Sequence, residues 1–123
     1  MTVFLGKWTF SRVETEMSAT IDDRGLTVEG RDMGIGVVEI WDDPVYEYSV
    51  TVGAVHLDGV LSALRTKMGD TPPTGEQTEN RDRLILDYLS EAFSKGTFHN
   101  STGYRQWLET NDLPNDRGTT PPG

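Results

Sequence analysis

Apolar and polar positions alternate with a period of two in the first half of the chain. From Val13 to Ile21 every second residue belongs to an apolar or small set, and glutamate and hydroxyl residues fill the positions between. Strict alternation of this length is typical of a strand with one buried face. Residues 22–25, Asp-Asp-Arg-Gly, supply turn chemistry. The pattern resumes over Leu26–Glu29, which predicts a β-hairpin.

Three further stretches of the first half favour strands. Residues Val3–Phe10 are rich in β-forming residues, and alternation would place Phe4, Trp8 and Phe10 on one face. Val37–Trp41 and Tyr46–Val52 predict a second hairpin around Asp42-Asp43-Pro44. In the last of these strands, Tyr48 shares a face with the valines of the same strand.

The period changes to 3.6 after this region, which predicts helices. One helix is expected to end at Gly69, a longer one near Ser94, and a short one to carry Tyr104, Trp107 and Leu108. The expected N-caps, in chain order, are Asp58, then Thr74 (with Gln77 at capping-box spacing) or Thr78, and then Ser101 or Thr102.

Strands followed by helices indicate an α+β fold. We expect an antiparallel meander of four or five strands in the N-terminal half, with about three C-terminal helices packed on one face. Residues 1–111 would form a single domain. Residues 112–123 show no period, and we expect them to form a flexible C-terminal tail.

Composition removes several classes of function. The 123 residues contain no cysteine, which excludes a disulfide framework, a thiolate metal site and a cysteine nucleophile. The formal net charge of −9 disfavours direct binding to nucleic acids or anionic membranes. The start of the chain does not resemble a signal peptide, and no apolar run approaches the roughly 18 residues of a membrane span. These features favour a cytoplasmic protein; they do not predict an oligomeric state.

The acidic residues are concentrated in the strands. Up to residue 59 the chain has four basic and eleven acidic residues, a net charge of −7, and the remainder has seven and nine. Alternation places several glutamates on the sheet face opposite the main apolar set. We expect this face either to be a solvated surface or to bind a basic protein partner. The candidate partner-binding residues are Glu14, Glu16, Glu29, Glu39, Trp41 and Glu47.

No motif for catalysis or for cofactor binding stands out. There is no G-x-S-x-G elbow, and Gly34-Ile35-Gly36 lacks the remainder of a dinucleotide loop. His56, Asp58 and His99 have no specific metal-binding spacing, so we predict neither a metal nor a cofactor. If the domain is an enzyme with a cavity between sheet and helices, His56, His99 and Tyr48 are the first candidates.

In size, acidity, absence of cysteine and order of strands and helices, the chain resembles small acidic immunity and inhibitor proteins of bacteria. This resemblance implies a non-enzymatic binder that blocks a basic partner, such as a toxin or nuclease. A phage-encoded inhibitor that mimics nucleic acid, or an acidic subunit of a larger complex, would share these features. The alternative is a small ligand-binding or enzymatic α+β domain, of cyclase or isomerase type, with a pocket between sheet and helices.

Overall fold

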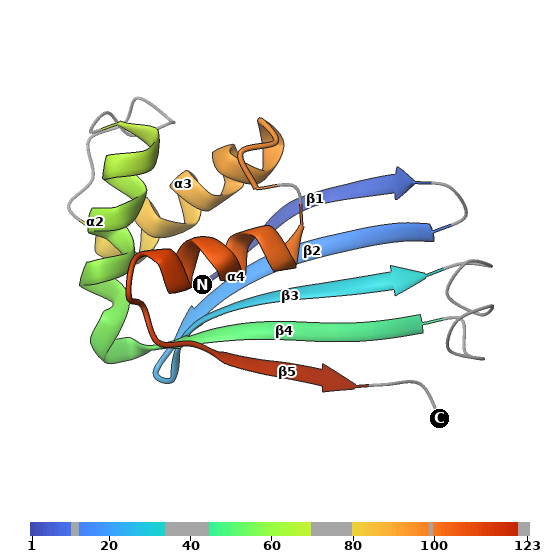
Figure 1. Ribbon diagram of the computed structural model, residues 1–123, viewed down its shortest axis with the longest axis horizontal. Helices are drawn as coiled ribbons and strands as arrows, with labels where there is room; N and C mark the ends of the chain where they lie inside the picture. The colour runs from blue at the N-terminus through green and yellow to red at the C-terminus, as the bar shows by residue number, and fades with distance from the viewer. Residues whose placement is uncertain (11–12, 34–44, 70–79, 99, 121–123) are drawn as a thin grey trace.

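The computed structural model describes residues 1–10, 13–33, 45–69, 80–98 and 100–120 of the chain. Its strands form one antiparallel five-stranded sheet in the order β1-β2-β3-β4-β5 (Figure 1). The predicted strand Val37–Trp41 lies outside the described residues. The strands are β1 (Thr2–Phe10), β2 (Val13–Asp22), β3 (Gly25–Met33), β4 (Val45–Gly53) and β5 (Asp116–Thr120).

The predicted hairpin between β2 and β3 is confirmed. The backbone N–H of Arg24 donates a 2.9 Å hydrogen bond to Asp22 Oδ1, which closes the turn. This hydrogen bond, which stabilises the ionised carboxylate, lowers the pKa of Asp22. Gly25 has φ +130°, and a Cβ there would lie 2.0 Å from the Val52 carbonyl oxygen. Only glycine therefore fits this position.

The helical elements follow the first four strands, as predicted, but they begin at other residues. Asn80 and Asn100 are the N-caps of α3 and α4, accepting hydrogen bonds of 3.1 and 2.8 Å from the N–H groups of Arg83 and Gly103. The predicted caps Asp58, Ser101 and Thr102 are therefore wrong, since they lie inside helices. Thr74 and Thr78 lie outside the described residues. The elements are η1 (Ala54–His56), α2 (Leu57–Met68), α3 (Arg81–Ser94) and α4 (Ser101–Thr110).

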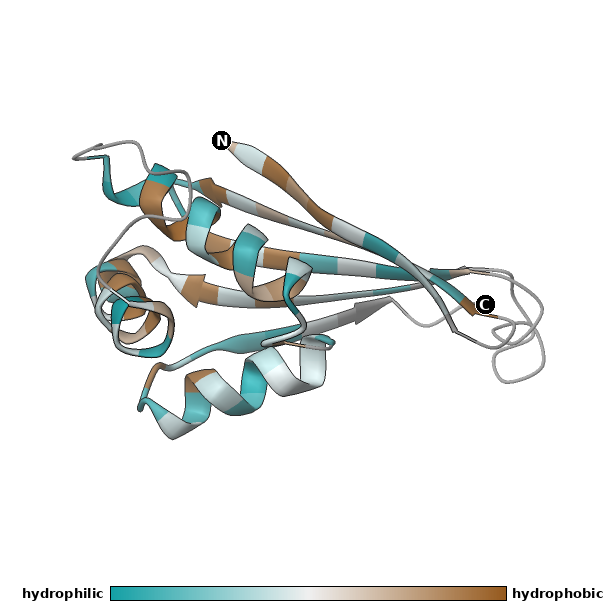
Figure 2. Cartoon of the chain, turned by 90° about the horizontal axis from the view of Figure 1, so that it is seen from above, coloured by the Kyte–Doolittle hydropathy of each residue, from teal (hydrophilic) through white to brown (hydrophobic). Residues whose placement is uncertain are grey.

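The helices pack on one face of the sheet and cover only part of it. In Figure 1 they gather over one half of the strands, and the other half extends beyond them. Figure 2 shows apolar residues concentrated where helices and strands meet, whereas the strand segments beyond the helices are mostly polar or neutral. The core therefore occupies one half of this face.

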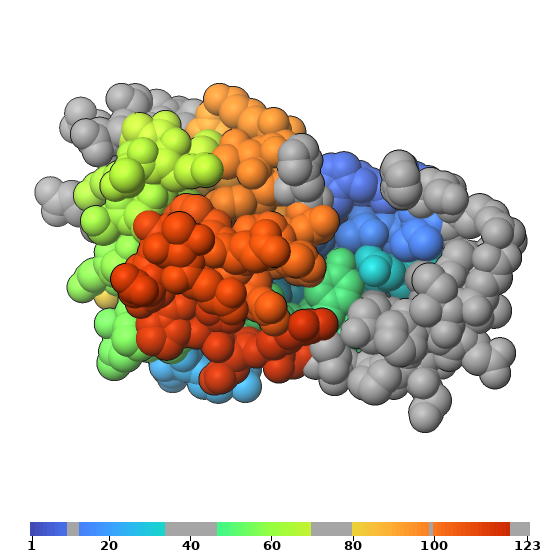
Figure 3. Space-filling model, in the orientation of Figure 1, coloured from blue at the N-terminus to red at the C-terminus, as the bar shows by residue number. Residues whose placement is uncertain are grey.

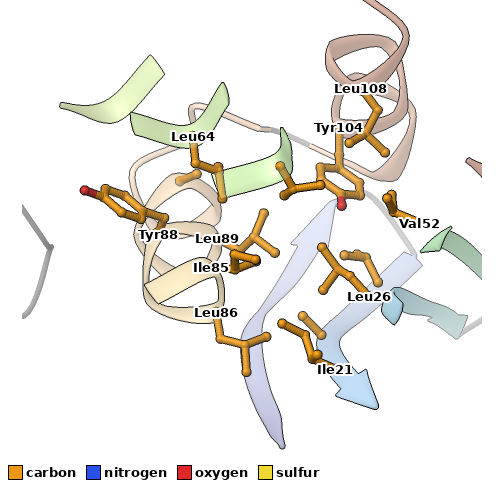
Figure 4. Close-up of a cluster of buried hydrophobic side chains, with 14 of the residues drawn as sticks. Ile21, Leu26, Val52, Leu64, Ile85, Leu86, Tyr88, Leu89, Tyr104 and Leu108 are labelled. Carbon is orange, nitrogen blue, oxygen red and sulfur yellow. The ribbon is translucent and has the colours of Figure 1, made fainter. Parts of the chain in front are cut away.

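The core combines aliphatic side chains from β1, β2, β3 and β4 with those of the three described α-helices. Figure 4 shows Ile85 and Leu89 of α3 between Leu64 of α2 and the side chains of the strands. An aromatic group adds to it, with ring centroids of Phe98 and Trp107 separated by 5.1 Å. Burial of each large apolar side chain contributes about 1.5–3 kcal/mol to folding, which makes this cluster the main source of stability.

Two tyrosines of the core differ in how their hydroxyl groups are satisfied. Tyr88 on α3 donates a 2.8 Å hydrogen bond to the carbonyl oxygen of Gly69, which ties α3 to the end of α2. Tyr104 on α4 is fully buried, and its hydroxyl has no hydrogen-bond partner in the described part of the chain. Burial raises the pKa of the Tyr104 phenol, because the charged form would lie in an apolar environment.

The prediction for β1 is wrong at Phe4. The pairing of β1 with β2 shifts register between Phe4 and Gly6, so that one additional residue, Leu5, is accommodated. Leu5 is buried, whereas the Phe4 side chain is 61% exposed. Simple alternation cannot anticipate such a bulge. Trp8, after the bulge, does pack against the core, with its ring centroid 6.3 Å from that of Phe93.

The C-terminal segment also differs from the prediction. We expected no regular structure after residue 111, but Asp116–Thr120 forms β5 and pairs with β4 from Glu47 to Thr51. The segment lacks apolar alternation because it is a short edge strand, held by backbone pairing. Leu113, which precedes β5, is buried in the core and anchors the connection from α4.

Among the residues that the structure describes, no helix combines the length and apolar character needed to cross a lipid bilayer.

Candidate functional site

A hollow of about 740 Å³ lies on the helix-facing side of the sheet, beside the N-terminus of α4. Figure 3 shows it between the orange α4 surface and the strands, where atoms of β3 and β4 form the floor. This is the part of the face that the helices leave uncovered. The described lining residues are Trp8, Thr9, Thr15, Met17, Asp32, Tyr48, Ser49, Val50, Asn100, Ser101, Thr102, Arg105 and Arg117.

The hollow begins where the inward-facing positions of the strands change from apolar to polar. Along β3 these positions run Leu26, Val28, Gly30 and Asp32, from fully buried to half-buried. The neighbouring strand β2 changes in the same direction and reaches Thr15 opposite Asp32. Polar groups that face inward are costly under a packed helix, so this pattern suits an open cavity.

Asp32 is the centre of a small hydrogen-bond network on the floor. Thr15 Oγ1 donates a 2.8 Å hydrogen bond to Asp32 Oδ1, and the Tyr48 hydroxyl donates a 3.1 Å bond to the same oxygen. The three side chains come from β2, β3 and β4. Within the described ranges, Asp32 Oδ2 accepts no hydrogen bond, and no lysine or arginine forms an ion pair with this carboxylate. Protein donors from β2 and β4 thus fix one of the two carboxylate oxygens.

The two aromatic residues of the hollow both lie over glycines. A Cβ on Gly30 would be 2.3 Å from Tyr48 Cε2, and a Cβ on Gly6 would be 2.6 Å from Trp8 Cζ2. Gly30 pairs with Tyr48 across the ladder, whereas Gly6 precedes Trp8 by two residues on the same strand. Because the glycines have no side chains, the rings occupy that space and fit closely against the sheet.

Two arginines lie at the side of the hollow formed by α4 and β5. Arg105 Nε is buried and lies 3.6 Å from Glu109 Oε1, an ion pair too long for a hydrogen bond. This N–H therefore has no hydrogen-bond acceptor within the described structure. Arg117 pairs with Val50 in the ladder and so projects on the helix-facing side; it forms no ion pair with any described residue.

The residues proposed from sequence for an enzymatic site do not come together. Tyr48 lies in the hollow, near the start of β4. His56 follows the end of β4 in η1, over the opposite half of the strands, and is not part of the lining. His99 lies outside the described residues. No group of three or more potential metal ligands occurs among the described side chains.

The opposite face of the sheet, called the outer face below, is not covered by any described helix. Strand register places the glutamates of β2, β3 and β4 on it, as alternation predicted. The register places Lys7 and Arg31 on the outer face as well. The period of two in the sequence accounts for the positions of the glutamates and of these two bases. The described charged residues of the outer face are Lys7, Glu14, Glu16, Asp22, Glu29, Arg31, Glu47 and Asp116.

Ion pairs neutralise part of this outer face. Lys7 Nζ lies 2.8 Å from Glu14 Oε1 and 3.8 Å from Glu16 Oε1, and the carboxylates raise the pKa of Lys7. Arg31 Nε lies 3.4 Å from Glu47 Oε1. Glu29 is exposed and has no such partner among the described residues. The remaining candidates, Glu39 and Trp41, lie outside the described residues.

Sequence reasoning missed most of the hollow. Asp32 has the same parity as Leu26 and Val28, so the alternation itself places its carboxylate on the inward face. That signal was present in the sequence. Arg105 and Arg117 gave no comparable signal, because their position depends on how α4 and β5 pack against the sheet.

No protein-family model matches this chain, and no curated protein and no solved structure matches it either. The candidate site therefore rests on its own geometry.

Proposed function

We propose that this protein is a small ligand-binding α+β domain and that the hollow is its binding site. The observation that carries this proposal is the convergence of the Asp32 network, two arginines and an aromatic wall on one cavity of about 740 Å³. Cavities of this size with a few placed polar groups are the usual sites for small molecules. The proposal concerns binding and does not include a catalytic step.

Burial of the polar groups supports this reading. The Thr15, Asp32 and Tyr48 side chains are half-buried, so their dipoles act in a medium of lower dielectric than water. A carboxylate and a guanidinium group in such a place would bind a complementary ligand more strongly than exposed groups would.

Fragment screening by NMR tests the proposal. A mixture of small aromatic acids, amines and neutral compounds is added to the ¹⁵N-labelled protein, and amide shifts are recorded. We expect hits to shift the amides of Thr15, Asp32 and Ser49 and to leave Thr27 and Thr51, on the outer face, unchanged. Hits that map elsewhere, or an absence of hits, would overturn the proposal.

A second function, binding of a basic protein through the outer face, is favoured by one observation. This face is uncovered, and its carboxylates outnumber its two bases in the described structure. Exposed ion pairs contribute little and are weakened by salt, so a partner's lysines and arginines could replace Lys7 and Arg31. A cytoplasmic inhibitor of a basic toxin or nuclease would use such a surface.

Reversal of Glu29 to Lys tests this second function most cleanly, since Glu29 takes part in no ion pair within the chain as described. Partners captured from a lysate of the source organism would be purified and titrated against wild type and Glu29→Lys. The expected result is a salt-dependent complex weakened about tenfold by the variant. Glu109→Lys on α4 is the control. A partner bound equally by wild type and Glu29→Lys would contradict the outer-face proposal.

A further inference from the structure

We infer that the hollow binds a small organic anion with an aromatic or similarly apolar body, whose acidic group lies between Arg105 and Arg117 at the N-terminus of α4. This inference rests on the proposed function, because it takes the hollow as the ligand site and specifies the ligand's chemistry.

The distribution of charge in the hollow carries the inference. In a chain with a net charge of −9, the described lining of this cavity has two arginines and only one carboxylate. A ligand with a positive charge would meet both guanidinium groups, whereas an acidic group would be attracted to them. Guanidinium groups are also the side chains best suited to hold carboxylates and phosphates.

Arg105 has a donor that the protein itself leaves unused. Its Nε is buried, yet the nearest acidic oxygen, on Glu109, lies beyond hydrogen-bond distance at 3.6 Å. Nε itself has almost no exposed surface, so an anion would approach Arg105 through the 30% of its side chain that is exposed and interact with the guanidinium charge at short range. The Glu109 side chain is 57% exposed and can remain in solvent when a ligand approaches.

The start of α4 strengthens the same end of the hollow. Asn100, Ser101 and Thr102 line it, and the Asn100 side chain is occupied in capping the N–H of Gly103. The positive end of a ten-residue helix therefore opens onto the hollow. This contribution adds to that of the guanidinium groups and would not define a site alone.

The geometry of the sheet keeps Asp32 away from Arg117. Asp32 lies on β3 and Arg117 on β5, two strands or roughly 10 Å apart across the sheet. Val28, Val50 and Arg117 lie opposite one another on β3, β4 and β5. Asp32 is four residues further along β3 than Val28, which separates it from Arg117 by roughly another 13 Å along the strand direction. Asp32 and Arg117 thus mark two ends of the hollow.

The space between these ends accommodates the body of a ligand. Trp8, Met17 and Val50 supply apolar surface there. At the far end, Asp32 Oδ2, which accepts no hydrogen bond from the described residues, would accept one from a hydroxyl or amino group of the ligand and repel a second acidic group. The expected ligand therefore has an acid at one end, an apolar ring in the middle and a hydrogen-bond donor at the other.

Two fluorescent probes with the same aromatic rings test whether the hollow binds ligands at all and whether it prefers an acidic one. Anilinonaphthalene sulfonate has an aromatic body and one acidic group, and N-phenylnaphthylamine lacks the acid. We expect the sulfonate to bind with a stoichiometry of one and at least about tenfold more tightly than the neutral probe.

Variants assign the binding to the arginines. Arg105→Gln and Arg117→Gln should each weaken sulfonate binding about tenfold and leave the neutral probe unaffected, whereas Arg117→Lys should retain most of the affinity. Arg83→Gln, which removes a surface ion pair with Asp87 on α3, is the matched control and should change nothing. Circular dichroism establishes that each variant is folded.

The outcomes distinguish the two proposals. Equal binding of both probes in the hollow, or sulfonate binding that does not depend on Arg105 and Arg117, would overturn the anionic ligand class and leave the hollow as a site. If neither probe binds, or if several sulfonate molecules bind without saturation at one site, both the ligand class and the proposed function are overturned.

Discussion

The ring of Tyr48 covers Gly30, its partner in the β3–β4 ladder, so closely that a Cβ on Gly30 would lie 2.3 Å from Tyr48 Cε2. The same ring places its hydroxyl 3.1 Å from Asp32 Oδ1, two residues further along β3. The glycine therefore sets the position of the ring, and the ring sets one hydrogen bond of the hollow.

Substitution of Gly30 by Ala should displace the Tyr48 ring and weaken its hydrogen bond to Asp32. We expect a loss of about 1–3 kcal/mol in the free energy of unfolding, as for other overpacked positions. Urea denaturation provides the measurement. Gly103→Ala is the control: its Cβ would lie at an ordinary 3.5 Å from Asn100 Oδ1, and in a helix it should stabilise by about 0.5–1 kcal/mol. Equal stability of Gly30→Ala and wild type would contradict this interpretation.

The two hydroxyl donors to Asp32 should be coupled, because they share one acceptor oxygen. Thr15→Val and Tyr48→Phe should each cost about 1 kcal/mol of stability, and the double variant should cost measurably more or less than the sum. A double-mutant cycle measured by urea denaturation gives the coupling energy. Thr27→Val and Thr51→Val, which remove a hydroxyl pair 3.2 Å apart on the outer face, provide a reference cycle. Strict additivity at Thr15 and Tyr48 would show that the network does not act as a unit.

Tyr104→Phe should leave the protein as stable or more stable, by up to about 1 kcal/mol, because the buried hydroxyl that it removes has no partner in the described structure. Tyr88→Phe, which removes the bond to Gly69, should instead destabilise by about 1 kcal/mol. Thermal and urea unfolding compare the two variants.

The raised pKa of Tyr104 gives these variants different alkaline behaviour. A folded-state pKa above the ordinary tyrosine value of about 10 means that the folded protein holds this proton more tightly than the unfolded chain. Stability from this group is fully present below pH 10 and is lost as the pH rises toward the folded pKa. The Tyr104→Phe variant should not show this loss of stability above pH 10. An identical alkaline profile for wild type and Tyr104→Phe would refute this assignment.

Asn100→Ala should destabilise α4 by about 1 kcal/mol, because the Gly103 N–H loses its acceptor. Ser101→Ala, at one of the two positions that the sequence predicted as the cap, should change stability by less than about 0.5 kcal/mol. The comparison by urea denaturation decides which residue caps the helix. A larger effect at Ser101 than at Asn100 would contradict the structure.

The fold class could be predicted from sequence periodicity because the periodic signals are local. The alternation of β2 and the turn at Gly25 each arise within ten residues, and the structure contains both. The predictions are wrong where a contact between residues distant in the sequence determines the local structure. The bulge at Leu5 depends on the register with β2, and β5 depends on a backbone edge that β4 offers. The sequence of Asp116–Thr120 has no apolar period that would predict this pairing.

The candidate site was less predictable than the fold for a related reason. The glutamates on the outer face follow from alternation alone, and the same alternation places Lys7 and Arg31 beside them. The hollow joins residues of four strands to residues of α4 and β5. Its floor could be read from the parity of Asp32, but its basic side is assembled only by tertiary packing.

The attachment of β5 has a consequence for the order in which the molecule is built. On the ribosome, β1 to β4 and the helices emerge before residues 116–120, so the nascent sheet has an open β4 edge until the last strand arrives. Arg117 arrives with that strand. The elements that form most of the core therefore precede β5 in the chain, and the basic side of the hollow is complete only after β5 has paired with β4.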